Sequence, residues 1–490
     1  MFNIIPPLSL FDTEDPAPST IIVTVSNIIT LSGLTPEQLI HLQTLLNFKY
    51  EVKEMRQREL VRETYIYPVV THNDHNGLTH VPYGALHVVK QLFPDALYQS
   101  RVTQNRAEGL PPLVIDREDR EGQKEALQAV YQYWKTKQLY SCCLIAPCGA
   151  GKSWLGVRLI DMAKQQTLIV CHTKDLLDQW VQNLERAFPG VEIGIIAAGK
   201  CKPGLLTVAL IQTLVKFLPE VKNMFGMMIL DEMHHLPAST FCTAANTINA
   251  RFKIGLTASE KRPDGLHPLI YATMGPIVHR MTQERMTADN VILAPYVWTI
   301  RSGWQWHGEA FDQYARMITA MSDDRDRNEL IVDTVLQLAE QGRNILCISG
   351  RVEHCKELQR MVERLKPGLS QVVVGTTNKT KRKEVITQLR AGFPITFAST
   401  NIAKEGLDAP LLDTLVWGTP ACNPNITQQA VGRIQRAGKT NTPLVVDFRD
   451  DECYRYSDAK DENSTSRLLF YHWRKRQRVY KMLGATIEEK

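Results

Sequence analysis

The sequence predicts an α/β protein with two doubly wound parallel sheets in tandem, preceded by a small α+β domain. Three observations support this prediction. The 490 residues are enough for about three domains of ordinary size. Apolar strand-like runs alternate with helical patterns in two separate series, which is typical of parallel sheets covered by helices. The first series contains a glycine-rich turn between a strand and a helix, where such sheets bind ligands.

The composition is typical of a globular protein, with 44% apolar and 22% charged residues. No run approaches the roughly 18 uninterrupted apolar residues of a membrane span, and no basic segment precedes an apolar stretch at the amino end. We therefore expect a cytoplasmic protein with no membrane partner. The 10 cysteines form no C-x-x-C pair, so neither a zinc site nor a disulfide framework is predicted. The net charge of +5 favours an anionic partner only weakly.

Residues 1–110 are predicted to form an accessory domain. Strand-like runs at Ile21–Val25 and Tyr65–Val70 accompany helical patterns at 36–48 and 83–93. Eight Lys or Arg stand against eleven Asp or Glu, so any contact with nucleic acid would use a local patch or shape rather than bulk charge. A role in folding or in docking a partner remains equally open. A Gly-Leu-Pro-Pro stretch at 109–112 predicts the linker that follows.

Residues 142–160 form the motif around which the chain is organised. The apolar run Cys142–Ile145 predicts a buried strand, and a glycine-containing turn and an amphipathic helix follow it. Converging backbone N–H groups and the helix N-terminus suit a phosphate chain, Lys152 supplies a cation, and Ser153 offers a hydroxyl to Mg²⁺. The predicted phosphate cradle is Pro147, Cys148, Gly149, Ala150, Gly151, Lys152 and Ser153. The alternative, a glycine-rich turn with an unrelated lysine, fits this context poorly.

Two carboxylates follow a second apolar strand, which begins at Met227. Asp231 at the strand tip can reach Mg²⁺, and Glu232 can polarise the water that attacks a γ-phosphate. A lone pair of this kind could merely favour a helix N-terminus. Its position about eighty residues after Lys152 favours the chemical interpretation. The first core domain is predicted to span residues 111–294.

The second series is predicted to form a domain over residues 295–465. It contains a strand at 345–349, a helix at 352–365 and further strands at 372–374, 395–398 and 415–417. Arg433 and Arg436 are three residues apart, so a helix would place them on one face, where two guanidiniums can bind one polyphosphate. As a bare spacing, two helix arginines are commonplace.

A basic helix is predicted at residues 466–490. Between Arg467 and Lys481 the chain has six Lys or Arg and no acid, interleaved with aromatic residues. This helix could contact phosphates. The favoured alternative is that its aromatics pack on the second core domain and its cations face solvent. A similar choice applies to Trp304 and Trp306, which could form a strand-separating wedge but are more simply explained as core.

Taken in order, these segments resemble the motif series of superfamily-two helicases over about residues 117–450. The phosphate loop resembles motif I, and Asp231-Glu-Met-His234 resembles motif II of the D-E-x-H kind. The loop sequence resembles the XPB branch, and the length, small first domain and basic tail look most like bacteriophage branched-DNA helicases of the UvsW type. The segment after Leu256 departs from that branch at Ser259 and Glu260. The resemblance implies a RecA-like fold for both core domains.

The resemblance also implies roles for individual residues. Gln123 resembles the glutamine that reads adenine in helicases, but Gly122 replaces its usual aromatic neighbour, and an exposed helix residue is the alternative. The other implied nucleotide-binding residues outside the loop are Gly406 and Asp408. The implied catalytic residues are Lys152, Glu232, Arg433 and Arg436, and the implied metal ligands are Ser153 and Asp231. The implied nucleic-acid contacts are His172, Thr173, Lys174, Gln212, Thr213, Arg351 and Thr400.

We therefore expect a monomeric ATP-dependent DNA helicase or translocase that uses ATP and Mg²⁺ at a seam between the two core domains. The resemblance implies remodelling of forks or Holliday junctions by branch migration, in replication, recombination or repair, in the host cytoplasm if the chain is a phage protein. Replication or recombination proteins are the expected protein partners. An RNA helicase of the D-E-x-H kind, an ATP-locked clamp without unwinding, and a duplex translocase serving a nuclease remain open.

Overall fold

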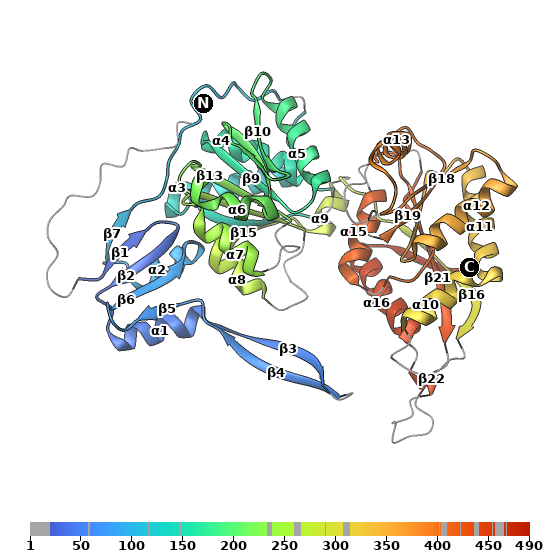
Figure 1. Cartoon of the computed structure of the whole chain (residues 1–490), viewed down its shortest axis with the longest axis horizontal. Coiled ribbons are helices and arrows are strands. Elements are labelled where there is room, and N and C mark those ends of the chain that lie inside the picture. Colours follow the sequence, from blue (N-terminus) through green and yellow to red (C-terminus); the bar gives the residue numbers. More distant parts are fainter. Residues whose placement is uncertain are drawn as a thin grey trace. The chain divides into compact units, whose positions relative to one another are not determined.

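The computed structural model divides into two compact units, Met1–Met281 and Thr282–Lys490, each described by itself (Figure 1). The structure describes residues 20–56, 59–115, 117–147, 149–232, 238–258, 266–289, 291–306, 314–400, 402, 409–421, 423–435, 441–452, 454–455, 465–466 and 468–490. The predicted fold class is confirmed: each unit contains a large, mainly parallel sheet, and a smaller sheet precedes the first one. No helix within the described ranges is long and apolar enough to span a bilayer.

The amino-terminal part of unit 1 is a five-stranded sheet of order β5-β6-β2-β1-β7, with a separate two-stranded ribbon. Hydrophobic residues such as Val23, Ile29 and Val81 alternate along the strands and form its core with helix α2. Its strands are β1 (Ile22–Val25), β2 (Ile28–Ser32), β5 (Thr71–Asn73), β6 (Leu78–Pro82) and β7 (Leu97–Ser100), the ribbon is β3 (Phe48–Arg56) and β4 (Glu59–Tyr67), and the helices are α1 (Pro36–Leu46), η1 (Tyr83–Ala85) and α2 (Leu86–Leu92).

The larger sheet of unit 1 has the order β11-β10-β12-β9-β13-β14-β8-β15. Its central strands are buried on both faces, as expected for a parallel sheet covered by helices. The strands are β8 (Ser141–Ile145), β9 (Thr167–Cys171), β10 (Ile193–Ala197), β11 (Lys200–Lys202), β12 (Leu206–Leu210), β13 (Met227–Asp231), β14 (Phe252–Thr257) and β15 (Ile277–Arg280). The helices are α3 (Glu121–Lys137), α4 (Lys152–Ala163), α5 (Lys174–Ala187), α6 (Ile211–Val221), α7 (Ala238–Thr247) and α8 (His267–Met274).

The amino-terminal sheet docks on the larger sheet of unit 1 through η1 and α8. A Cβ atom at Gly84 would lie 2.3 Å from the backbone nitrogen of Gly275, so only glycine allows this approach. The Tyr83 hydroxyl donates to the Arg251 carbonyl oxygen at 2.8 Å. The predicted linker follows, and the Val114 N–H donates to the Ala187 carbonyl oxygen. The accessory region and first core domain therefore form one body.

Unit 2 is built on a wholly parallel sheet of order β18-β19-β17-β20-β21-β16-β24. Its strands are β16 (Tyr296–Trp306), β17 (Ile345–Ser349), β18 (Ser370–Val373), β19 (Ile395–Ser399), β20 (Thr414–Trp417), β21 (Leu444–Glu452) and β24 (Thr486–Glu489), and β22 (Tyr454–Arg455) pairs with β23 (Thr465–Ser466). The helices are α9 (Gln283–Ala288), α10 (Tyr314–Asp323), α11 (Arg325–Glu340), α12 (Val352–Leu365), α13 (Lys379–Arg390), α15 (Pro424–Ile434) and α16 (Leu468–Met482).

Unit 2 begins earlier than the boundary after residue 294 that the sequence suggested. The Leu293 N–H donates to the Gln435 carbonyl oxygen at 2.7 Å. The Gln435 side-chain amide donates back to the Leu293 carbonyl oxygen at 3.1 Å. These bonds attach the segment before β16 to the end of α15.

The carboxyl-terminal helix α16 packs on β21 and does not present all its cations to solvent. Tyr480 and Arg476 are buried, and Arg476 pairs with Asp447. The described part of this helix therefore packs its aromatic side on the second core domain, as the favoured alternative predicted. The prediction that its cations face solvent is wrong for Arg476. Trp304 is also core, because it is 8% exposed and packs in a cluster with Met317.

Candidate nucleotide site

The phosphate loop lies between β8 and α4, as the sequence predicts. Gly149 and Gly151 have φ angles of 84° and 83°, in a region that other residues seldom adopt. The turn therefore depends on glycine at these two positions. Ala150 between them is buried, and Lys152 and Ser153 are the first residues of α4. Cys148 lies outside the described residues.

Contacts with the loop backbone and with Glu232 hold Lys152 in place. Its Nζ lies 3.3 Å from the Ala146 carbonyl oxygen and 3.0 Å from Oε1 of Glu232. Both side chains of the ion pair are largely shielded from solvent, with 11% and 15% exposed. The structure thus brings the predicted phosphate-binding cation and the predicted general base into direct contact.

Asp231 ends β13 beside this pair and is 3% exposed. Its Oδ1 accepts the Glu232 N–H at 3.0 Å, and its Oδ2 accepts the Trp180 indole N–H at 2.8 Å. Burial and the Glu232 carboxylate raise the pKa of Asp231 to about 6, although Lys152 and the two N–H donors oppose the rise. The carboxylate is therefore ionised at neutral pH and lies where a divalent cation could be bound.

Gln123 is not an exposed helix residue, so that alternative is wrong. It is 2% exposed and belongs to the first turn of α3. Its Oε1 accepts the Arg120 N–H at 3.1 Å, and its Nε2 donates to the Ala150 carbonyl oxygen at 2.8 Å. The Arg120 guanidinium donates to the Gly149 carbonyl oxygen at 3.2 Å. Gln123 and Arg120 therefore support the phosphate loop, and reading of adenine by Gln123 remains a prediction.

Trp154 and Trp180 are site residues that the sequence interpretation missed. Trp154 carries the Arg117 guanidinium 4.6 Å over its ring and donates its indole N–H to Asp119 at 2.6 Å. Asp119 also pairs with Arg158 at 3.0 Å. The bond from Trp180 to Asp231 joins residues 51 positions apart, and no spacing in the sequence indicates it.

The predicted nucleic-acid contacts of unit 1 lie after β9 and β12, at the carboxyl edge of the sheet. The Gln212 amide donates to the His172 carbonyl oxygen at 3.2 Å and so joins these two segments. Thr173 caps α5 by accepting the Leu176 N–H. Lys174 and Gln212 are exposed, whereas Thr213 is buried.

In unit 2, the structure describes some of the predicted residues. Arg351 follows β17 and donates to the Ala315 carbonyl oxygen at 2.9 Å, which ties it to α10. Thr400 follows β19 and is half-buried, as is Arg433 on α15. Gly406, Asp408 and Arg436 lie outside the described residues.

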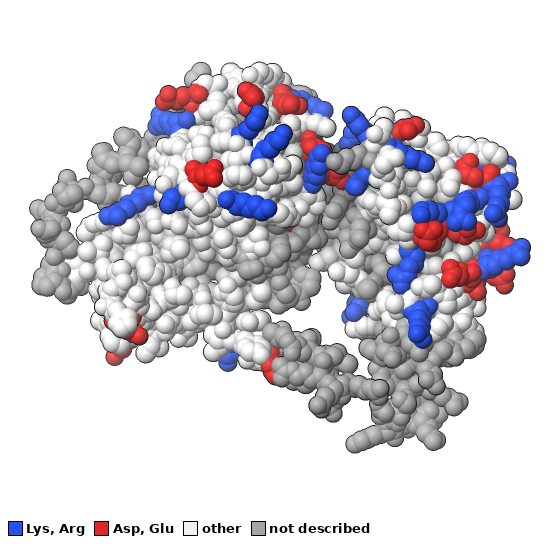
Figure 2. Space-filling view, viewed as in Figure 1, with Lys and Arg blue, Asp and Glu red and all other residues white. Residues whose placement is uncertain are grey.

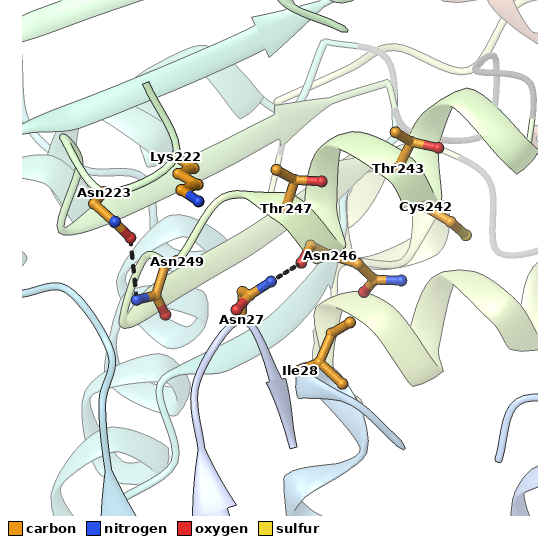
Figure 3. Close-up of a pocket in the computed structure, with 9 residues that line it drawn as sticks. All are labelled: Asn27, Ile28, Lys222, Asn223, Cys242, Thr243, Asn246, Thr247 and Asn249. Atoms are coloured by element: carbon orange, nitrogen blue, oxygen red, sulfur yellow. Dashed lines mark hydrogen bonds between the residues drawn. The ribbon is translucent and has the colours of Figure 1, made fainter. Parts of the chain in front are cut away.

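A polar cavity of about 490 Å³ lies away from this site, between the β1–β2 turn and the ends of α6 and α7 (Figure 3). Asn27 donates its side-chain amide to the Asn246 carbonyl oxygen, and Asn249 donates to Asn223 at 3.4 Å. Lys222 and Asn223 precede β13, so the cavity is at the amino edge of the sheet, opposite Asp231. It belongs to the docking contact of the amino-terminal sheet.

Two family models match the chain. Residues 117–262 match the type III restriction enzyme, res subunit, and residues 326–438 match the helicase conserved C-terminal domain. The matched ranges include the phosphate loop, Asp231 and Glu232 in the first case, and Arg351, Thr400 and Arg433 in the second.

Among similar proteins, a "Putative ATP-dependent RNA helicase" of Acanthamoeba polyphaga mimivirus is 27% identical over 345 residues, 68% of this chain and 64% of that protein. A "DNA 3'-5' translocase XPB2" of Sulfurisphaera tokodaii is 26% identical over 349 residues, 63% of this chain and 77% of that protein. The structure of S. cerevisiae Dbp5 bound to RNA and ADP BeF3 aligns with 76% of this chain and 90% of its own, with a TM-score of 0.54 and 12% identity. This last likeness establishes the tandem RecA-like fold alone.

Proposed function

The chain belongs to the superfamily-two helicases of the XPB-like type, and on that basis we propose that it couples ATP hydrolysis to movement along DNA. The contact of Lys152 with Glu232 beside Asp231, at the edge of the phosphate loop, carries the proposal. The matches cover only part of each relative, so the activity and substrate of this chain are inferred from its own site.

The residues at the loop fit a triphosphate substrate with Mg²⁺. Lys152 would bind phosphate oxygens, Ser153 and Asp231 would hold the cation, and Glu232 would take the proton of the attacking water. Because Lys152 is paired with Glu232, capture of a phosphate by the ammonium would also release the carboxylate to act as a base. Binding of the phosphate and activation of Glu232 would then occur in one step.

Arg433 and Arg436 are the proposed contributors from unit 2. Guanidiniums that act on transferring phosphoryl groups contribute about 10³ to 10⁵ in rate. Arg433→Ala should therefore retain ATP binding and lose most of its hydrolysis, measured by equilibrium nucleotide binding beside steady-state phosphate release. Hydrolysis within a few-fold of the unmodified chain would remove Arg433 from the mechanism.

We propose branched DNA as the preferred substrate, with forks and four-way junctions remodelled in replication, recombination or repair. The predicted contacts after β9, β12, β17 and β19 would bind a backbone, which carries no sequence information. Figure 2 shows cationic and anionic side chains interspersed over unit 2 on the face drawn, which favours recognition of shape over bulk charge.

An RNA helicase is the second candidate, because the mimivirus relative carries that name. The deciding experiment compares stimulation of ATP hydrolysis by single-stranded RNA, linear duplex DNA and a four-way DNA junction. We expect the junction to stimulate most. Strongest stimulation by RNA would overturn the DNA assignment. Lys152→Ala is the control, and we expect it to bind nucleic acid but to lose hydrolysis by at least about 10²-fold.

A further inference from the structure

Three buried polar side chains of unit 2, Ser349, His354 and Asn328, form a chain of hydrogen bonds behind the loop that follows β17, here named the His354 relay. Nδ1 of His354 on α12 lies 2.9 Å from Oγ of Ser349 at the end of β17. Nε2 of His354 lies 2.8 Å from Oδ1 of Asn328 on α11. The relay therefore joins a central strand to two helices that pack side by side (Figure 1). The proposed chemistry of the nucleotide site uses none of the three side chains.

The bonds of the His354 relay run in one direction. Asn328 donates its side-chain amide to the Ser322 carbonyl oxygen at 2.8 Å, so its Oδ1 faces His354 and can only accept. Nε2 of the neutral ring therefore carries the hydrogen, and Nδ1 accepts the Ser349 hydroxyl. Oγ of Ser349 in turn accepts the Arg351 N–H at 3.1 Å. The outer end of the relay is thus the main chain of Arg351.

The His354 ring stays neutral at ordinary pH. Burial and the Arg327 charge lower the pKa of His354 to about 3, so the relay keeps one tautomer. Neutral hydrogen bonds of this kind add little net stability over an apolar cluster of the same shape. A fully bonded buried network does, however, fix one conformation. The contribution of the relay is therefore the fixed position of the loop at its outer end.

The side chain and the main chain of Arg351 are both held. Its guanidinium donates to the Ala315 carbonyl oxygen at 2.9 Å and to Oγ1 of Thr319 at 3.3 Å, both on α10. The preceding N–H, that of Gly350, donates to Oγ1 of Thr419 at 2.7 Å. Two successive N–H groups of the loop are therefore bonded inward, to hydroxyl groups of the protein. A ligand at this loop would meet the Arg351 side chain.

This loop lies at the carboxyl edge of the sheet, beside a second predicted nucleic-acid contact. A Cβ atom at Gly350 would lie 3.9 Å from Oγ1 of Thr400, which follows β19. Arg351 and Thr400 therefore belong to one short stretch of this edge. A guanidinium that is already held in place suits a backbone phosphate, because it loses less freedom on binding.

We propose that His354 is a positioning residue for nucleic acid: through Ser349 it fixes the main chain at Arg351, so that the guanidinium meets a backbone phosphate in one orientation. This inference rests on the proposed function and gives a buried histidine control over a contact that it does not itself touch. Loss of the relay would loosen Arg351 without removing it. Binding of nucleic acid should therefore weaken more than hydrolysis slows on saturating nucleic acid.

The test titrates ATP hydrolysis by the full chain with a four-way DNA junction, or with single-stranded RNA if RNA stimulates more. His354→Leu breaks the relay and fills its space with an apolar side chain. We expect the nucleic-acid concentration at half-maximal rate to rise about 2- to 12-fold, as for one lost hydrogen bond, with little change in the rate at saturation. His354→Asn keeps an acceptor for the Ser349 hydroxyl and should restore most of the affinity.

A double-mutant cycle with Arg351→Ala separates positioning from general destabilisation. If His354 acts through Arg351, His354→Leu should not raise the half-saturating concentration further once the guanidinium is gone. Additive effects would overturn the inference, as would an Arg351→Ala variant that binds as tightly as the unmodified chain. In either case the proposed function stands if nucleic acid still stimulates hydrolysis. If no nucleic acid stimulates hydrolysis, the proposed function fails, and this inference fails with it.

Gln371→Leu is the matched control, because it also replaces a buried polar side chain of unit 2. The Gln371 amide donates to Oγ1 of Thr396 at 2.9 Å, near the amino end of β19 and so at the other edge of the sheet. This variant should keep the half-saturating concentration of the unmodified chain. An increase equal to that of His354→Leu would show that destabilisation alone weakens binding. If His354→Leu fails to fold, Ser349→Ala breaks the same relay at a smaller side chain and takes its place in the cycle.

Discussion

The two units bury charged side chains in different ways. In unit 1, Asp231 is bonded by a backbone N–H and an indole, and Lys253 is fully buried with its Nζ 2.6 Å from the Ala245 carbonyl oxygen and 4.9 Å from the Tyr83 ring centroid. Unit 2 buries matched pairs. Arg327 meets Asp450 at 2.7 Å, and Arg476 meets Asp447 at 2.8 Å.

This difference separates charges that can change from charges that cannot. Burial lowers the pKa of Lys253 to about 7 and raises that of Asp231 to about 6, so both lie near neutral pH. In unit 2, burial alone would lower the pKa of Arg476, but Asp447 raises it further above its usual range. The unit 1 charges can respond to a ligand or to pH, whereas the Arg476 guanidinium stays charged beside Asp447.

The paired charges of unit 2 hold a single loop. Nη1 of Arg327 donates to the Gly418 carbonyl oxygen at 2.6 Å, and Nη1 of Arg476 donates to the Ala421 carbonyl oxygen at 3.0 Å. This loop follows β20 and leads into α15, which carries Arg433. The ion pairs therefore position the helix that the proposed mechanism needs.

The largest expected effect comes from breaking one of these pairs. Asp447→Asn leaves the Arg476 guanidinium buried without its counter-charge, which should cost about 3–5 kcal/mol in the free energy of unfolding of unit 2. Urea denaturation of the full chain measures it. Glu489→Gln is the control, because the Glu489 side chain is 59% exposed beside Arg449 and such a pair contributes about 0–1 kcal/mol. If the two variants lost the same free energy of unfolding, the buried pair would contribute no more than an exposed one, and the proposed difference between the units would be wrong.

Lys253→Met should have the opposite sign, because it removes a buried charge that pairs with no carboxylate among the described residues. We expect a gain of about 1–4 kcal/mol at neutral pH. The pKa of this lysine is lower in the folded chain than in the unfolded chain, where it is ordinary. The unfolded state therefore binds more protons between about pH 7 and the usual lysine range, and stability rises with pH through that window.

Thermal unfolding at pH 6.5 and pH 9 tests this sign. The unmodified chain should gain stability from this group on going to pH 9, and the methionine variant should lack that gain. A variant that melts lower at both pH values would show that Lys253 stabilises the contact with Tyr83.

Asp231→Asn is expected to separate stability from activity. The folded chain raises the pKa of this carboxyl to about 6. The group therefore stabilises the folded state at pH values below its ordinary pKa, and this stabilisation is lost as the pH rises through about 6. The asparagine variant should therefore gain about 1–3 kcal/mol at pH 7.5. It should also lose hydrolysis, because the proposed cation ligand is gone. Melting curves and phosphate release on one preparation check both, and a less stable variant would contradict the first.

The sequence predicted the parts of this site that depend on short-range pattern. The glycine turn, Lys152 and the Asp231–Glu232 pair could be predicted because a strand, a loop and a helix fix their geometry locally. Trp180 and Arg476 could not be, since each meets its partner through tertiary packing. The sequence predicted that Arg476 faces solvent, whereas its side chain is buried. A run of cations does not show which of them is buried.

The fold, too, could be predicted only where it depends on short-range sequence pattern. Strands buried on both faces, such as β9 and β17, were predicted because they read as continuous apolar runs. The edge strand β24 was not, because Thr486–Glu489 has polar residues and gains its place only by pairing with β16. The ribbon formed by β3 and β4 was equally hidden, since the pairs Phe48–Tyr67 and Tyr50–Tyr65 meet only in the register of two paired strands.

The smallest expected effect tests whether Asp231 is tuned by its hydrogen bonds. The Trp180 indole N–H stabilises the ionised carboxylate, so Trp180→Phe should raise the pKa of Asp231 further. Cation binding requires the ionised form, so the acid limb of the rate of ATP hydrolysis, expected near pH 6, should move upward by about 0.5–1 pH unit. The pH profile of kcat/KM, taken at Mg²⁺ and ATP concentrations well below saturation, measures this shift, because it reports the groups of the free enzyme. Trp154→Phe is the matched control, because that indole donates to Asp119. If both variants had the same acid limb as the unmodified chain, the pKa of Asp231 would not determine how the rate falls at low pH. The buried Asp231 carboxylate would then serve stability alone, as the buried ion pairs of unit 2 do.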